Sequence, residues 1–350
     1  MKKRAIQNIL VPVDFSPMSI EAIAVAKNLA QQTGATVHLA HVHHAQYPVG
    51  FRGPVLSQSE YAVSFEEHRK EVLSEDLQEL ARRNGLARAS AVHLCEGVSV
   101  YREICRLAQR IRADLIVMPT HGRTALAHVL LGSTAERIVQ HSPCPILVTR
   151  TAGKKTAPAK KTASKERLIL VPVDFSKTSL EALEYAIEFT AGTPVKLIIL
   201  HVIDLGDALS TDGLGIYRFS DVRDVAREET ERQMADLPNR VDLDKIPFET
   251  TIRNGKPVTE ICALAKERNV DLIVASTHGR TGLEHLLIGS VAEQVVRHAD
   301  RAVLVVPSHP AARAKDLAHI VRRDRAGAIA EAGEMIFAGR SAAAFAGVRL

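Results

Sequence analysis

The sequence predicts two tandem α/β domains, each with a doubly wound, five-stranded parallel sheet that carries helices on both faces. The first observation is an internal repeat: residues 9–16 and 169–176 have the same sequence, ILVPVDFS. In addition, each copy alternates short β-branched runs with helical patterns, which is typical of βαβ units. Finally, the runs at 115–118 and 272–275 are almost entirely apolar, as strands covered on both faces are.

The elements of the first copy follow from this alternation. Ser16 follows the first strand at the position of a helix N-cap, and Gly132-Ser133 opens the last helix in the same way. We expect strands near residues 6–13, 36–42, 90–95, 114–118 and 145–149. We expect helices near residues 17–33, 60–84, 98–112 and 133–141.

The second copy repeats the motifs of the first, but not all of them at the same distance along the chain. ILVPVDFS returns after 160 residues, whereas THGRT at 120–124 returns at 277–281, after 157 residues. Domain one therefore covers residues 1–150 and domain two covers 167–307. Residues 151–166, rich in Lys and Ala, are predicted to be a flexible linker. The Ala- and Arg-rich tail, residues 308–350, has no counterpart in the first copy, and we assign it no function.

Composition limits the class of protein. No run approaches the roughly 20 apolar residues that span a bilayer, and no signal peptide is evident, so we expect a cytoplasmic protein without a membrane partner. The four cysteines show no CxxC spacing, which favours buried free thiols. The net charge is +5, but the linker and the tail contribute +4 and +3. The folded body is thus not basic, and no nucleic-acid partner is expected.

Two features of each copy lie where an open parallel sheet binds ligands, beyond the carboxyl ends of its strands. Asp14 and Asp174 follow the first strands, and a carboxylate there can accept hydrogen bonds from an adenine amino group or a ribose hydroxyl. The alternative is an Asp that only shapes a turn or caps a helix.

A glycine-bearing loop after the fourth strand is the second feature. Glycine lets the backbone approach a ligand, and the N–H groups of a helix N-terminus bind anions without a lysine. Each Gly-Ser pair can instead be only a helix cap, and each loop arginine can instead be solvated. The candidates are Thr120, Gly122, Arg123, Gly132, Ser133 and Thr134, and in the second copy Ser276, Thr277, Gly279, Arg280, Gly289, Ser290 and Val291.

The sequence resembles the universal stress protein family over about residues 5–150 and 167–307. The motifs that carry this resemblance are VPVD, THGRT and the Gly-Ser pair that follows. The resemblance implies a Rossmann-like, adenine nucleotide alpha hydrolase-like fold and a bound ATP or other adenine nucleotide, with or without Mg²⁺. It implies that the backbones of Val42 and Val202 meet the adenine ring. It places the adenosine part on Pro12, Val13, Asp14, Pro172, Val173 and Asp174, and phosphates on Ser133, Thr134, Ser290 and Val291.

One position departs from the family pattern, in which G-x-x-G is followed by nine residues and then G-S or G-T. The nine-residue spacing is kept in both copies, but the first glycine is Pro119 in one and Ser276 in the other. Proline fixes φ and lacks an N–H, whereas Ser276 keeps its N–H. The second copy is therefore the better predicted site.

The predicted function is a nucleotide-sensing regulator of the stress response. The alternatives are a scaffold that works through protein interaction without nucleotide, and a slow ATPase. The sequence contains neither a GxxxxGK[ST] motif nor a repeated set of metal ligands, which argues against fast hydrolysis. No metal site is predicted at residues 41–44, because only His41 returns, as His201.

The fifth strands, at 145–149 and 302–306, are apolar and end their sheets, and an exposed apolar edge invites pairing. The resemblance implies a dimer contact there, so we expect an internal pseudo-dimer of the two domains. A further homodimer and an unknown protein partner stay open.

Overall fold

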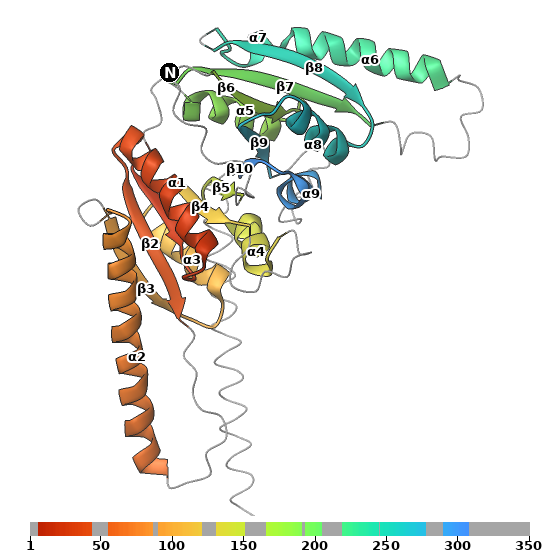
Figure 1. Ribbon diagram of the computed structural model, residues 1–350. Helices are drawn as coiled ribbons and strands as arrows, with labels where there is room; N and C mark the ends of the chain where they lie inside the picture. The colour runs from red at the N-terminus through yellow and green to blue at the C-terminus, as the bar shows by residue number, and fades with distance from the viewer. Residues whose placement is uncertain are drawn as a thin grey trace, which may run out of the picture. The chain divides into compact units, whose positions relative to one another are not determined.

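The computed structural model describes residues 6–43, 55–86, 90–120, 131–150, 166–190, 193–204, 219–244, 246–277 and 290–307. These ranges contain the strands and helices of both repeats (Figure 1). Residues 151–165 of the expected linker and the whole expected tail, 308–350, lie outside them.

The first repeat has the predicted order of elements. Its strands are β1 (Asn8–Pro12), β2 (Thr36–His43), β3 (Ser90–Glu96), β4 (Leu115–Pro119) and β5 (Ile146–Thr149). Its helices are α1 (Pro17–Thr33), α2 (Val55–Arg83), α3 (Val100–Arg110) and α4 (Ser133–His141). The start predicted for α2 was wrong, because α2 begins at Val55 rather than near residue 60.

The second repeat follows the same order. Its strands are β6 (Arg167–Pro172), β7 (Val195–Ile203), β8 (Phe248–Asn254), β9 (Leu272–Ser276) and β10 (Ala302–Val306). Its helices are α5 (Lys177–Thr190), α6 (Phe219–Ala235), α7 (Leu237–Arg240), α8 (Pro257–Glu267) and α9 (Ser290–His298). The one-turn helix α7, which has a proline in its first turn, was not predicted.

The strands within the described ranges form one ten-stranded sheet in the order β3-β2-β1-β4-β5-β10-β9-β6-β7-β8. Within each repeat the strands are parallel, as predicted. The two repeats meet where β5 and β10 pair antiparallel, with Leu147 opposite Leu304 and Val148 opposite Val303. The two apolar edge strands thus cover each other, which removes two exposed edges.

Two hydrophobic cores lie on opposite faces of the sheet, and each runs through both repeats. One contains residues of α1, α2, α5, α6 and α7 and includes both Leu147 and Leu304. The other contains residues of α3, α4, α8 and α9 and includes Val148 and Val303. Because successive side chains of a strand point to opposite faces, the short pair β5–β10 joins both cores at once.

A half-buried polar cluster distinguishes the first repeat from the second. His38 Nδ1 lies 2.9 Å from His93 Nε2, and His38 Nε2 lies 3.1 Å from Asn8 Oδ1. Burial lowers the pKa of both histidines, and the neighbouring His38 and Arg110 lower the pKa of His93 further. By the repeat and the strand register, the second repeat has Leu168, Ile198 and Thr251 at these positions.

The cysteines are free, but only Cys105 and Cys144 are buried, whereas Cys95 and Cys262 are half-buried. The prediction of buried thiols therefore holds for two of them. Among the helices of the described ranges, none has the length and apolar character that crossing a membrane requires.

Replacing Leu304, which is fully buried, by alanine should lower the free energy of unfolding by about 2–5 kcal/mol, because it opens a cavity at the junction of the repeats. Chemical denaturation followed by circular dichroism measures this change. Since the core is continuous, both repeats should unfold in one transition in the wild type. Two separate transitions with only one of them shifted would contradict the continuous core.

Acid should destabilise the protein through His38 and His93. Their pKa values are lowered in the folded state, so the unfolded chain takes up protons first as the pH falls below about 6.5, and stability is lost in that direction. The double variant His38→Ile, His93→Thr has the side chains of the second repeat. Its unfolding free energy, measured between pH 7.5 and 5.5, should depend less on pH than that of the wild type. An unchanged pH dependence would show that the pair does not carry the effect.

Candidate functional site

The strand order reverses once in each repeat, between β1 and β4 and between β6 and β9. From β1 the chain proceeds outward to β2 and β3, whereas β4 proceeds to β5 on the other side. Leu10 pairs with Ile116 in the first repeat, and Leu170 pairs with Ile273 in the second. Such a reversal is where open α/β sheets bind ligands. The segments after β1 and β4 therefore begin at the same edge of the sheet, as the sequence predicted.

Asp14 shapes its own turn. Its Oδ1 accepts a hydrogen bond from the Ser16 N–H at 3.0 Å, and Ser16 Oγ accepts one from the Ser19 N–H at 3.2 Å as the N-cap of α1. Asp14 remains half-buried, next to the half-buried Pro12 and the buried Val13. The alternative in which this aspartate shapes a turn is thus observed, through its Oδ1 atom.

The corresponding turn of the second repeat is built around Asp174. Asp174 Oδ1 accepts from both the N–H and the Oγ of Ser176, at 3.1 and 2.5 Å. The Asp174 N–H donates to Ser179 Oγ at 3.3 Å. Pro172 is half-buried and Val173 is buried, as in the first repeat. Asp174 therefore also shapes its own turn, through the serine two residues later.

The residue after each aspartate adopts a left-handed conformation that the sequence did not reveal. Phe15 has φ +62° and Phe175 has φ +63°. A bulky side chain in this region costs on the order of 1–3 kcal/mol, and such strain concentrates at functional sites. No glycine or asparagine marks the position, so only the exact repetition of the letters DFS in both copies was a signal.

A histidine of the neighbouring strand contacts each of these turns. His41 Nδ1 lies 2.7 Å from the Val13 carbonyl oxygen, and His201 Nδ1 lies 2.7 Å from that of Val173. The ring centroids of His41 and Phe15 are 4.9 Å apart, and those of His201 and Phe175 are 4.7 Å apart. The next residue on the strand, predicted to meet adenine, is buried in the first repeat (Val42) and half-buried in the second (Val202).

The predicted phosphate loop of the first repeat is closed at its base. The Gly132 N–H donates to the Thr120 carbonyl oxygen at 2.9 Å. Gly132 is the N-cap of α4 and brings no side chain to cover the first turn, while Ser133 and Thr134 are exposed. This end of α4 has the N–H groups and the partial positive charge that an anion needs.

In the second repeat the described part of the loop is shorter. The half-buried Ser276 ends β9, and the Thr277 N–H donates to the Val306 carbonyl oxygen at 3.0 Å. Helix α9 begins at Ser290, and Val291 is exposed. The candidates Gly122, Arg123, Gly279, Arg280 and Gly289 lie outside the described residues.

One arginine compensates the acidic side chains in the first turns of both candidate phosphate helices. Arg297 Nη2 lies 3.0 Å from Glu293 in its own helix and 3.4 Å from Glu136 of α4 in the other repeat. Without a counter-ion, a carboxylate near a helix N-terminus would compete with a phosphate for the same positive end. Arg297 therefore reduces the negative charge at both helices.

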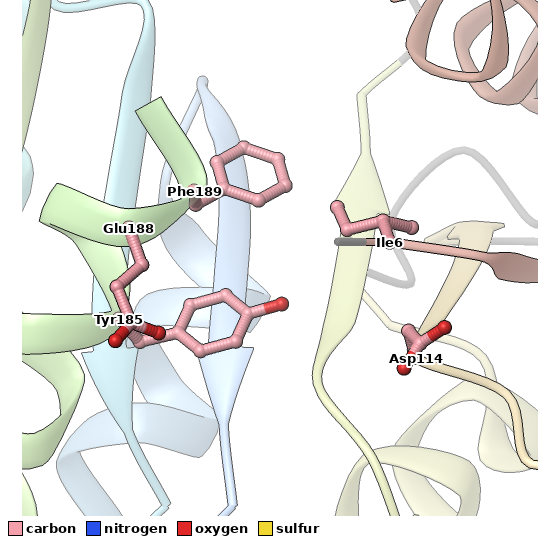
Figure 2. A pocket seen from close by; sticks show the side chains of 5 residues that line it. All are labelled: Ile6, Asp114, Tyr185, Glu188 and Phe189. Carbon is pink, nitrogen blue, oxygen red and sulfur yellow. The ribbon is translucent and has the colours of Figure 1, made fainter. Parts of the chain in front are cut away.

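The cavity at the junction of the repeats is not this site. It is lined by Ile6, Asp114, Tyr185, Glu188 and Phe189, and its volume of about 10 Å³ leaves room for at most one water. Figure 2 shows the Tyr185 hydroxyl pointing from α5 toward Ile6 and Asp114. Ile6 and Asp114 precede β1 and β4, so the cavity lies at the amino ends of the strands. Nowhere in the described ranges do three or more histidine, cysteine or acidic residues gather as metal ligands would.

Comparison with known proteins agrees with the repeated fold. The Universal stress protein family matches residues 5–150 and 166–307. A universal stress protein of Mycolicibacterium smegmatis is 28% identical over 305 residues, 85% of this chain and 96% of that protein. One of Methanocaldococcus jannaschii is 31% identical over 138 residues, 39% of this chain and 80% of that protein.

A solved structure shares the tandem fold. It belongs to a functionally unknown protein of Pseudomonas aeruginosa, is 18% identical, covers 91% of this chain and 98% of its own, and has a TM-score of 0.59. The matched ranges together cover most of the 350 residues. The chain therefore belongs to the universal stress protein family, as a tandem of two such domains.

Proposed function

We propose that this stress protein binds an adenine nucleotide at the carboxyl edge of its sheet, and that the second repeat is the better site. The observation that carries the proposal is the strained turn at the switch point. In both repeats an aspartate precedes a left-handed phenylalanine at the end of the first strand, directly beside the strand that leads into the glycine loop.

The nucleotide would meet three kinds of group. Asp174 would accept hydrogen bonds from the adenosine part, with Pro172, Val173 and the backbone of Val202 along the base. The first turn of α9, with Ser290 and Val291, would hold phosphates through backbone N–H groups. In the first repeat the matching groups are Asp14, with Pro12, Val13 and Val42, and the first turn of α4. A Mg²⁺ ion would enter with the phosphates, since its usual ligands include substrate phosphate oxygens.

Two differences support the preference for the second repeat. Ser276 ends β9 where Pro119 ends β4, so only the second repeat has a backbone N–H at that position. Val202 is half-buried whereas Val42 is only 7% exposed, so a ligand can approach Val202 more easily.

The activity that follows is regulation rather than turnover. A ligand that binds only the folded protein stabilises it by about 2.7 kcal/mol at a hundred times its dissociation constant. Occupancy would thus favour the conformation in which the glycine loops contact phosphate, and a protein partner would recognise that conformation. The cytoplasm, where ATP is abundant, is the compartment that this proposal implies.

A second candidate, a scaffold that works without nucleotide, is favoured by one observation. Pro119 is an integral part of β4, where it pairs with Thr149 in the register of the sheet. A loop that leaves the sheet through a proline has one N–H group fewer for a phosphate. In this case the first repeat would serve only to pair with the second.

Release of ligand from the purified protein separates the two candidates. Denaturing the full-length protein and recording the ultraviolet spectrum and mass of the released small molecules should show an adenine nucleotide. Protein that releases none, and whose melting temperature does not change with millimolar ATP, supports the scaffold instead.

The two glycines that precede the phosphate helices should differ in importance. Gly289→Val should abolish most of the ATP-dependent rise in melting temperature, because a β-branched side chain there obstructs approach to the first turn of α9. Gly132→Val is the matched change in the first repeat and should reduce the rise less. Differential scanning fluorimetry with and without ATP measures both. Equal, full melting shifts in both variants would refute the loop assignment.

A further inference from the structure

The ladder between the first two strands of each repeat ends in an unusual way. The Val13 N–H donates to the Ala40 carbonyl oxygen at 2.7 Å, and the Val173 N–H donates to that of Leu200 at 2.8 Å. In a continuing parallel ladder, the carbonyls of Val13 and Val173 would next accept from the N–H groups of Val42 and Val202. A histidine side chain is bonded to each of these carbonyls instead, His41 and His201.

The direction of the neighbouring groups supports this reading. The Gly97 N–H donates to the His43 carbonyl oxygen, and the Gly255 N–H donates to that of Ile203. Main-chain groups of successive residues in a strand point to opposite sides. The N–H and C=O groups of Val42 and Val202 therefore point away from β3 and β8, toward the place where the first strand leaves the sheet.

We propose that His41 and His201 are positioning residues, each of which ends the pairing of the first strand, holds the aspartate turn, and leaves the main chain of the next valine facing the ligand crevice. This proposal rests on the proposed function and names the residues that prepare the site. An adenine edge needs one donor and one acceptor side by side, and a strand residue with both groups on one side supplies them.

The hydrogen bond also fixes the tautomer of each imidazole. A carbonyl oxygen can only accept, so Nδ1 of His41 and of His201 must carry the proton. The ring then packs on the phenylalanine that has positive φ, and Phe175 is buried against His201. Two contacts from one histidine thus support the strained residue that directly follows the aspartate.

The test uses the full-length chain, ATP, and three variants of the second repeat. His201→Asn keeps a donor at the position of Nδ1, because the side-chain nitrogen of asparagine is separated from Cα by the same number of bonds. His201→Leu keeps bulk without a donor. His298→Leu is the matched control, since His298 Nδ1 also bonds a backbone carbonyl, that of Gln294 at 2.8 Å, but at the far end of α9.

Isothermal titration calorimetry should give dissociation constants for His201→Asn and for the control within about threefold of the wild type. His201→Leu should bind about tenfold more weakly, which corresponds to about one well-placed hydrogen bond. Nitrogen-15 spectra of labelled histidine, recorded without nucleotide, should show His201 protonated at Nδ1.

The outcomes are distinguishable. If the wild type binds ATP and His201→Leu binds equally well, or if His201 carries its proton on Nε2, the positioning role is overturned while the proposed function stands. If the wild type binds no nucleotide, the proposed function is overturned. A weaker His201→Leu together with an equally weak His201→Asn would also overturn the role of the hydrogen bond.

Discussion

The departure of the first strand from the sheet is the constraint on which the rest of the site depends. Pairing with the second strand stops at Val13 and Val173, and the chain turns through a left-handed phenylalanine before α1 and α5 begin. The aspartate hydrogen bonds to the helix start and the histidine contact to the strand offset the strain of this turn. Because the strand order also reverses here, the turn lies at the edge of the sheet where open α/β sheets bind ligands.

The junction of the repeats makes one structural unit of two similar domains. The pair β5–β10 connects both hydrophobic cores, and Arg297 connects the first turns of α4 and α9 electrostatically. An isolated domain would expose an apolar edge strand, whereas the tandem covers it within the same chain. The charge at the candidate phosphate helix of the first repeat, α4, consequently depends on Arg297 of the second repeat.

The sequence predicted the parts that depend on periodicity and repetition. The apolar runs form β4 and β9, and the repeated ILVPVDFS motif forms the same strand and turn in each repeat. The two edge strands pair with each other. It did not predict the left-handed Phe15 and Phe175, because intrinsic preference would place glycine or asparagine there. Nor did it reveal the role of His41 and His201. Each histidine bonds a residue that lies 28 positions earlier in the sequence, and such a contact leaves no local sequence pattern.

The central claim is that the switch point of the second repeat is a nucleotide site. Equilibrium dialysis of the full-length protein against labelled ATP tests it most directly. We expect saturable binding that approaches one nucleotide per chain before a weaker second site fills, and loss of the first site when Asp174 is replaced by alanine. Binding that does not saturate, or that is unaffected by this replacement, would contradict the claim.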